Sequence, residues 1–143
     1  MEKYEILKEL SHKQRRNIIP SKKLQYTDLK RITKYLDNSI FNRNRCSLWK
    51  GSVTNINNSK RGIYINFYFR GKKCALHRLL YINFVDDLKN YEYLKYNCEN
   101  KGSCCNINHF YKVVRRRRLG TIKKQIESNS SSSNSSEKYK IKI

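Results

Sequence analysis

Three cysteines and a histidine gather in a stretch of twelve residues, and this cluster constrains the fold more than any other feature of the chain. Cys98, Cys104, Cys105 and His109 are separated by polar residues and by Gly102, which allows the backbone to turn back on itself. Thiolates and an imidazole brought together by a tight turn are the usual ligands of structural zinc. Taking Cys98, Cys104 and His109 as ligands leaves a tetrahedral ion one ligand short.

Cys46 is the predicted fourth ligand, in the segment Cys46-Ser47-Leu48-Trp49-Lys50-Gly51. Cys74 and Cys105 are then dispensable, although a slip of the loop by one residue would let Cys105 replace Cys104. The alternative is that all these cysteines are unconnected free thiols, buried as small apolar side chains. A structural metal suits so small a chain, because its binding free energy becomes folding free energy.

The composition indicates a polyanionic partner. The 143 residues contain 32 Lys and Arg against 11 Asp and Glu, a formal net charge of +21. The first five residues lack the apolar segment of a signal peptide, and no stretch is long enough to span a membrane. An odd number of cysteines in such a chain indicates thiolates rather than disulfides. We therefore expect a soluble, intracellular protein without a membrane partner.

Hydrophobic periodicity predicts an α+β fold. Apolar residues at helical spacing predict helices over 3–16 and 27–38. The nearly continuous apolar run over 77–85 predicts a buried helix, and Thr121 as an N-cap predicts a last short helix over 121–127. Alternation from Ile63 to Phe69 predicts a half-buried strand. A turn over 70–73 and a returning strand over 74–76 complete a hairpin, and 110–114 is a further strand.

The chain divides into three predicted parts. Residues 1–40 form a helical arm, in which packing is favoured over DNA reading, and 41–127 form a zinc-stapled domain. Residues 128–143 form a Ser/Asn-rich tail with a basic end, which we expect to be disordered.

The order of these motifs resembles the zinc-binding region of His-Cys box homing endonucleases and their HNH-type viral relatives. These belong to the His-Me finger (ββα-metal) group. Their pattern is, in order, Cys-x-x-Trp-x-Gly, a hairpin, His-Arg-Leu, His-x-Cys and Cys-x-Asn-Pro-x-His. The matching segments of this chain begin with Cys46-Ser47-Leu48-Trp49-Lys50-Gly51, continue with His77-Arg78-Leu79 and end with Cys104-Cys105-Asn106-Ile107-Asn108-His109. The resemblance covers residues 46–109. It implies a ββα-metal-like domain with structural zinc held by Cys46, Cys98, Cys104 and His109.

The chain departs from the family at both catalytic positions. In active members the His of His-x-Cys is the general base, and an Asn beyond the zinc ligands holds Mg²⁺. Here Tyr96 stands at the base position, and Gln125 stands at the Asn position in Gly120-Thr121-Ile122-Lys123-Lys124-Gln125. A phenol, with a pKa near ~10, is a poor base at neutral pH. The resemblance therefore implies a nucleic-acid-binding protein that is catalytically impaired.

Two alternatives to this function stay open. One is an active, Mg²⁺-dependent endonuclease, in which His77 serves as the base and Glu99 or Glu127 supplies a carboxylate for the cation. The other is a basic structural or packaging protein of a virus particle. The viral relatives in this resemblance imply the nucleus, a viral factory or a virion as the compartment of the protein.

Clustered basic residues are the predicted nucleic-acid contacts, with double-stranded DNA favoured over RNA. Each guanidinium can form paired hydrogen bonds with phosphate oxygens. The predicted contacts are Arg61, Arg70, Lys72, Lys73, Arg78, Arg115, Arg116, Arg117 and Arg118. The arginine run has a second interpretation as a localisation signal. The eleven tyrosines offer stacking platforms for bases, but packing is the favoured role for most of them.

Overall fold

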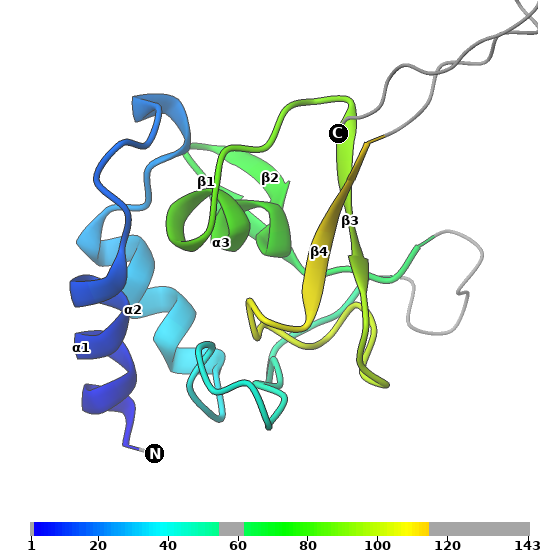
Figure 1. Cartoon of the computed structure of the whole chain (residues 1–143). Coiled ribbons are helices and arrows are strands. Elements are labelled where there is room, and N and C mark those ends of the chain that lie inside the picture. Colours follow the sequence, from blue (N-terminus) through cyan, green and yellow to red (C-terminus); the bar gives the residue numbers. More distant parts are fainter. Residues whose placement is uncertain (1, 55–61, 115–143) are drawn as a thin grey trace, which may run out of the picture.

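The computed structural model describes residues 2–54 and 62–114, and the structural statements below refer to these two ranges. Several predictions lie outside them: the contacts of Arg61 and Arg115–Arg118, the roles of Gln125 and Glu127, the helix over 121–127 and the tail over 128–143. Within the described ranges the fold is α+β, with three α-helices, a 3₁₀ turn and two small antiparallel sheets (Figure 1).

Two N-terminal helices lie side by side, as α1 (Lys3–Lys13) and α2 (Tyr26–Tyr35) (Figure 1). Each begins with a capping box, in which an acidic side chain at the third position accepts a hydrogen bond from the residue before the helix. Both predicted helices are confirmed, but each ends three residues earlier than the pattern suggested. α2 stops because Leu36 adopts an extended conformation and forms a β-bridge with Trp49.

The predicted hairpin is formed by β1 (Asn66–Phe69) and β2 (Lys72–Ala75). Its turn is only Arg70-Gly71, both with positive φ, as a tight two-residue hairpin turn requires. Lys72 and Lys73 therefore belong to the strand, and the prediction that they form part of the turn is wrong. Phe67 and Phe69 are buried as the alternation predicted, but β1 begins at Asn66 and not at Ile63.

A buried helix, α3 (Leu76–Phe84), follows β2 directly and lies between the helical pair and the second sheet (Figure 1). Leu76 begins this helix, which corrects its predicted place at the end of a strand. Most of the helix is buried, as expected from its nearly continuous apolar sequence.

The second sheet pairs β3 (Glu92–Tyr96) with β4 (Phe110–Val114) in antiparallel fashion. Tyr96 lies opposite Phe110, so the segment from Cys98 to His109 forms the loop of this hairpin. The two ends of the metal-ligand cluster are thereby brought together by strand pairing.

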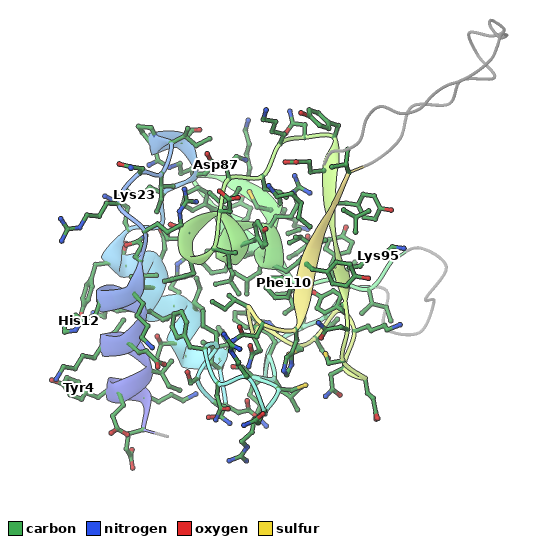
Figure 2. The ribbon with its side chains drawn as sticks, in the orientation of Figure 1. Tyr4, His12, Lys23, Asp87, Lys95 and Phe110 are labelled. Atoms are coloured by element: carbon green, nitrogen blue, oxygen red, sulfur yellow. The ribbon has the colours of Figure 1, made fainter. Side chains whose placement is uncertain are left out.

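One hydrophobic core joins the two N-terminal helices to the rest of the described chain. Ile6 and Ile32 belong to the same buried cluster as Leu80 and Phe110. Figure 2 shows Tyr4 and His12 on the outer side of α1, and Lys95 pointing away from β3.

A buried asparagine, Asn83, fastens the segment before α2 to α3. Its Oδ1 accepts hydrogen bonds from the Gln14 side chain (2.7 Å) and from the backbone N–H of Leu24 (3.0 Å). Its Nδ2 donates to the carbonyls of Lys22 (2.9 Å) and Leu79 (2.8 Å). A buried amide with all of these partners fixes the relative position of the segments that it joins.

Candidate metal centre

The four predicted zinc ligands converge in the structure. The potential ligand atoms of Cys46, Cys98, Cys104 and His109 all lie within 4.8 Å of one another. His109 Nδ1 is 3.5 Å from both Cys46 Sγ and Cys104 Sγ. With Zn–S near 2.3 Å and Zn–N near 2.0–2.1 Å, the S···N edge of a zinc tetrahedron is about 3.6 Å. The spacing therefore fits a tetrahedral metal ion.

The β3–β4 hairpin positions three of these ligands. Cys98 follows β3 and His109 precedes β4, and the hairpin continues beyond the sheet because the Asn97 N–H donates to the His109 carbonyl at 2.9 Å. Inside the loop, the Asn100 carbonyl accepts hydrogen bonds from the N–H groups of Ser103 (3.2 Å) and Cys104 (3.0 Å). This turn directs Cys104 back toward Cys98.

Gly102 is required where this loop meets the segment before β1. Its φ is +86°, a conformation that L side chains rarely adopt, and a Cβ would collide with the side chain and carbonyl of Ile63. The sequence suggested a glycine for backbone freedom. The structure adds the close approach of Ile63.

Cys46 reaches the cluster because its segment runs along the loop. Leu48 forms an antiparallel β-bridge with Cys104, and the Trp49 N–H donates to the Ser103 carbonyl at 3.0 Å. On the other side, the Cys105 N–H donates to the Ser47 carbonyl at 2.6 Å. These bonds place the fourth thiol beside the other three ligands.

A hydrogen bond to the Arg43 carbonyl fixes which ring nitrogen of His109 faces the thiols. His109 Nε2 lies 3.0 Å from the Arg43 carbonyl oxygen, which can only accept a hydrogen bond. Nε2 therefore carries the proton, and the Nδ1 lone pair is free on the side of the sulfurs. Metal-bound histidines commonly have such a partner, which fixes the tautomer and the ring orientation.

Hydrogen-bond donors surround two of the sulfurs. Asn100 Nδ2 lies 3.2 Å from Cys46 Sγ, and the Asn106 N–H lies 3.4 Å from Cys104 Sγ. Burial raises the pKa of Cys104 to about 12 and also raises the pKa of Cys98. Burial acts in the same direction on Cys46, but the hydrogen bonds from Asn100 and the neighbouring ligands outweigh it and lower its pKa. A bound cation would favour the thiolate form of all three.

The other two cysteines do not join the cluster. Cys105 is buried in the hydrophobic core, where burial raises its thiol pKa, so Cys104 rather than Cys105 supplies the ligand. Cys74 lies in β2. That both are dispensable for metal binding stays a prediction.

Asn106 holds the two halves of the site together, a role that the sequence did not reveal. It is fully buried, and its Nδ2 donates to the carbonyls of Asn42 and Arg45, the latter at 2.7 Å. Its Oδ1 accepts a hydrogen bond from the Asn108 N–H at 2.8 Å. The family-like Cys-x-Asn motif marked the position without indicating its partners.

Tyr96, which stands at the family's base position, packs against His77, the residue considered as an alternative base. Their ring centroids are 5.6 Å apart, and both rings contact Phe110. Burial raises the Tyr96 pKa, and burial followed by the charge of Arg78 lowers the His77 pKa to about 4. The Tyr96 hydroxyl and His77 Nδ1 are buried and have no hydrogen-bond partner among the described residues. Glu99 is exposed in the metal-site loop.

The predicted phosphate contacts within the described ranges lie on and beside the first hairpin. Arg70 donates to the Pro20 carbonyl at 2.9 Å, and Lys72 and Lys73 are exposed on β2. Arg78 is half-buried and donates to the carbonyls of Glu92 (2.7 Å) and Lys89 (3.0 Å). The structure therefore groups these residues but does not itself assign them a ligand.

These features define a small α+β protein with a Cys₃His centre that is able to hold a metal ion. The chain is 54% identical over 121 residues to "Uncharacterized protein R328" of Acanthamoeba polyphaga mimivirus. The aligned region covers 85% of this chain but 35% of that viral protein, so the chain spans about a third of its length. No protein-family model matches the chain, and no solved structure matches it. No helix in the described ranges is long and apolar enough to cross a membrane.

Proposed function

We propose that this protein is a zinc-stapled nucleic-acid-binding protein that contacts phosphates, derives from a His-Me finger endonuclease and is impaired in cleavage. The convergence of four ligands at tetrahedral spacing, in a chain of net charge +21, carries the proposal. The resemblance of residues 46–109 to the His-Me finger pattern supplies the evolutionary part of it.

The zinc would have a structural role. Three thiols and an imidazole supplied by the protein complete a tetrahedron, whereas catalytic zinc sites keep one position open for water or substrate. The hydrogen bonds from Asn100 and Asn106 to the sulfurs, and from His109 to Arg43, form the supporting shell that such centres have.

An exposed face on α2 and β1 supports contact with nucleic acid. Tyr26 and Tyr68 are 58% and 60% exposed, and the Arg31 guanidinium, which donates to the Tyr68 carbonyl at 2.8 Å, joins the two elements. Lys30 and Lys34 lie near tyrosine rings on the same helix. Cations bind phosphates, and exposed aromatic rings stack on bases. We name Tyr26, Lys30, Arg31, Lys34, Tyr35 and Tyr68 the α2 face.

The surroundings of Tyr96 support impaired cleavage. Burial raises the pKa of the Tyr96 phenol, so less of it is ionised at neutral pH and it is a poorer general base than a phenol in water. His77 is neutral at pH 7, but its ring packs against Tyr96 and Phe110. The Tyr96 hydroxyl and His77 Nδ1 are both buried, so neither of these atoms is exposed to activate a water molecule.

A salt titration tests the binding. Labelled duplex and single strands of equal length are titrated with the zinc-loaded protein by fluorescence anisotropy, between low and moderate salt. The observed association constant should fall with salt at a log–log slope of about −0.9 per phosphate neutralised on duplex DNA. Replacing Lys30 and Lys34 by Gln should flatten the slope by about two units, whereas Lys8→Gln on α1 serves as the matched control.

Each alternative function predicts a different outcome. Absence of binding to either strand form at low salt would overturn the nucleic-acid proposal. Magnesium-dependent nicking of plasmid that persists in Tyr96→Phe would overturn impaired cleavage and support an endonuclease that uses His77. Saturation only at a protein-to-DNA ratio that coats the duplex would favour the packaging alternative.

A further inference from the structure

The 3₁₀ turn Pro20–Lys22, η1, lies beside a cavity that is also lined by β2 and α3. We propose that this cavity binds a phosphate monoester. The cavity has a volume of about 240 Å³ and lies apart from the metal centre, since it shares no residue with it. We name it the η1–α3 cavity. This proposal is independent of nucleic-acid binding by the α2 face.

Positive charge converges on the η1–α3 cavity from three elements. Lys22 comes from the end of η1, Lys73 from β2 and Arg78 from the first turn of α3, and no carboxylate is found among the described residues that line the cavity. Bringing cations together is unfavourable unless an anion offsets their repulsion. Ala75, the N-cap of α3, also lines the cavity, so the positive end of the helix dipole adds to this potential.

The backbone around these cations is held in place before any ligand binds. Asn83 donates to the Lys22 carbonyl at 2.9 Å, and Arg70 donates to the Pro20 carbonyl at 2.9 Å. The guanidinium of Arg78 donates to the carbonyls of Glu92 and Lys89. An arrangement fixed in advance loses less conformational entropy when it binds a ligand.

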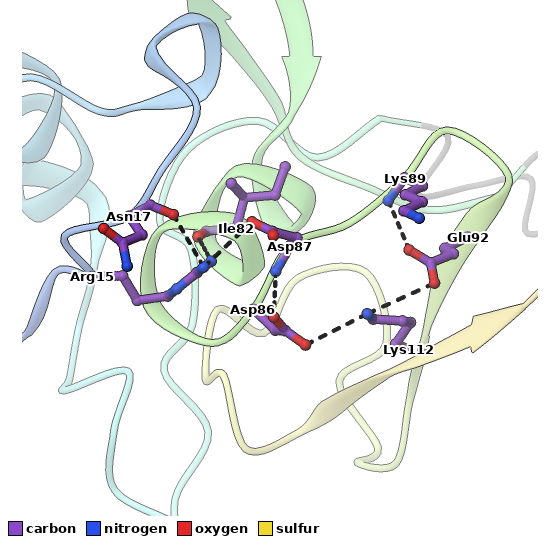
Figure 3. A network of polar contacts seen from close by, with 8 residues as sticks. All are labelled: Arg15, Asn17, Ile82, Asp86, Asp87, Lys89, Glu92 and Lys112. Atoms are coloured by element: carbon purple, nitrogen blue, oxygen red, sulfur yellow. Dashed lines mark hydrogen bonds and ion pairs between the residues drawn. The ribbon is translucent and has the colours of Figure 1, made fainter. Parts of the chain in front are cut away.

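The loop over 85–91 borders the cavity. Figure 3 shows the ion pairs formed by Asp86 and Asp87 in this loop and by Glu92 in β3. Asp86 Oδ2 and Glu92 Oε2 lie 3.6 and 3.7 Å from Lys112 Nζ, and Asp87 Oδ1 lies 3.3 Å from Arg15. These ion pairs partly neutralise the carboxylates and brace the loop. The same loop contributes Leu88 and Asn90 to the cavity lining.

The lining selects the ligand chemistry. The ammonium groups of Lys22 and Lys73 and the amide of Asn90 are hydrogen-bond donors for the oxygens of a phosphate. The guanidinium of Arg78 donates to backbone carbonyls and contributes its positive charge. Leu79, Ile82 and Leu88 provide an apolar surface for a small organic group attached to that phosphate. Two sources share this chemistry: a free phosphate ester, and the terminal phosphate of a nucleic-acid strand.

Cys74 provides a reporter, because it is part of the cavity wall and is half-buried rather than inaccessible. Zinc-loaded full-length protein is alkylated with iodoacetate, which is anionic, or iodoacetamide, which is neutral, and labelling at Cys74 is quantified by mass spectrometry. The positive potential should raise the ratio of the iodoacetate rate to the iodoacetamide rate above the same ratio in the unfolded chain. Lys73→Gln should reduce this ratio, whereas Lys95→Gln on the outer side of β3 should leave it unchanged.

Protection of Cys74 identifies the ligand. The probes are glycerol phosphate and an oligonucleotide with either a 5′-phosphate or a 5′-hydroxyl, with chloride at equal ionic strength as the reference. Saturable protection by glycerol phosphate supports a free ester, and protection only by the 5′-phosphorylated strand supports a strand end. Lys22→Gln and Lys73→Gln should each raise the half-protecting concentration by about tenfold.

Two results would overturn the proposal. One is protection by both phosphate probes no greater than that by chloride. The other is equal protection by the 5′-phosphate and 5′-hydroxyl strands without any effect of glycerol phosphate. Glycerol phosphate contains no nucleic acid, so its result does not depend on the proposed function.

Discussion

Replacing Cys104 by Ser is the most direct test of the metal centre. The substitution removes the Cys104 sulfur, which lies 3.5 Å from His109 Nδ1, and leaves a hydroxyl, a weaker zinc ligand, in a buried position. Three ligands would remain around an ion that requires four. We expect the purified variant to lose its zinc and to unfold at a much lower temperature.

The expected loss is comparable to the whole stability of the fold. Structural zinc contributes an apparent binding free energy of about 10–16 kcal/mol at neutral pH in small zinc-folded peptides. A domain of this size typically has a free energy of unfolding of about 5–15 kcal/mol. If zinc occupies the cluster, the chain should have little folded population without it, and a strong chelator should unfold the wild-type protein at 25 °C.

Elemental analysis and thermal melting by circular dichroism measure the two effects. Wild type should contain about one zinc ion per chain. Cys74→Ser is the matched control, because that thiol lies outside the cluster, and Cys105→Ala tests whether core damage alone releases the metal. If Cys104→Ser kept its zinc and its melting temperature, the ligand assignment would be refuted.

Three further predictions concern the surroundings of the site. Gly102→Ala should lower the free energy of unfolding in urea by about 2–4 kcal/mol, because it combines positive-φ strain with the collision at Ile63. Gly71 also has positive φ but has open space around it, so Gly71→Ala should lower the free energy of unfolding by only about 1–2 kcal/mol. The His77 pKa is about 4 in the fold and near 6.5 when unfolded, so its contribution, at most about 3 kcal/mol, is present above pH 6.5 and lost as the pH falls toward 4. Urea unfolding of His77→Phe at pH 7 and 4.5 should show a smaller pH dependence than wild type, and an equal dependence would count against this assignment. In a plasmid-nicking assay with Mg²⁺, the wild type should not exceed background and Tyr96→His alone should restore little, because an imidazole base without a held cation leaves most of the barrier.

The elements that were predicted well have a local signal. The period of apolar residues indicated α1, α2 and β1, and the spacing of Cys98, Cys104 and His109 indicated a turn that gathers ligands. Helix ends were less certain, because Leu36 leaves α2 to pair with Trp49, a residue distant in sequence.

The features that were missed depend on contacts between distant segments. The sequence predicted a strand over 110–114 but did not indicate its partner. Its pairing with β3 depends on the loop over 97–109, which brings the two strands together. Asn83 resembles an ordinary polar residue in sequence, and the Cys-x-Asn motif marks Asn106 without indicating its partners. The roles of both residues come from backbone groups that converge on their side chains. The η1–α3 cavity likewise requires Lys22 and Lys73 to meet across the fold.

The placement of Cys46 has a consequence for the lifetime of the protein. A metal ion shared by Cys46 and Cys98 would close a loop of about fifty residues that contains β1, β2, α3 and β3. Like a disulfide, this cross-link would restrict the unfolded chain, by about 4 kcal/mol for a loop of that length. Unlike a disulfide, it would be opened by oxidation, since a sulfenic acid or a new disulfide at the cluster no longer supplies thiolate ligands. The persistence of the folded chain should therefore follow the thiol–disulfide balance of its compartment, and mild peroxide should shorten its half-life under proteolysis.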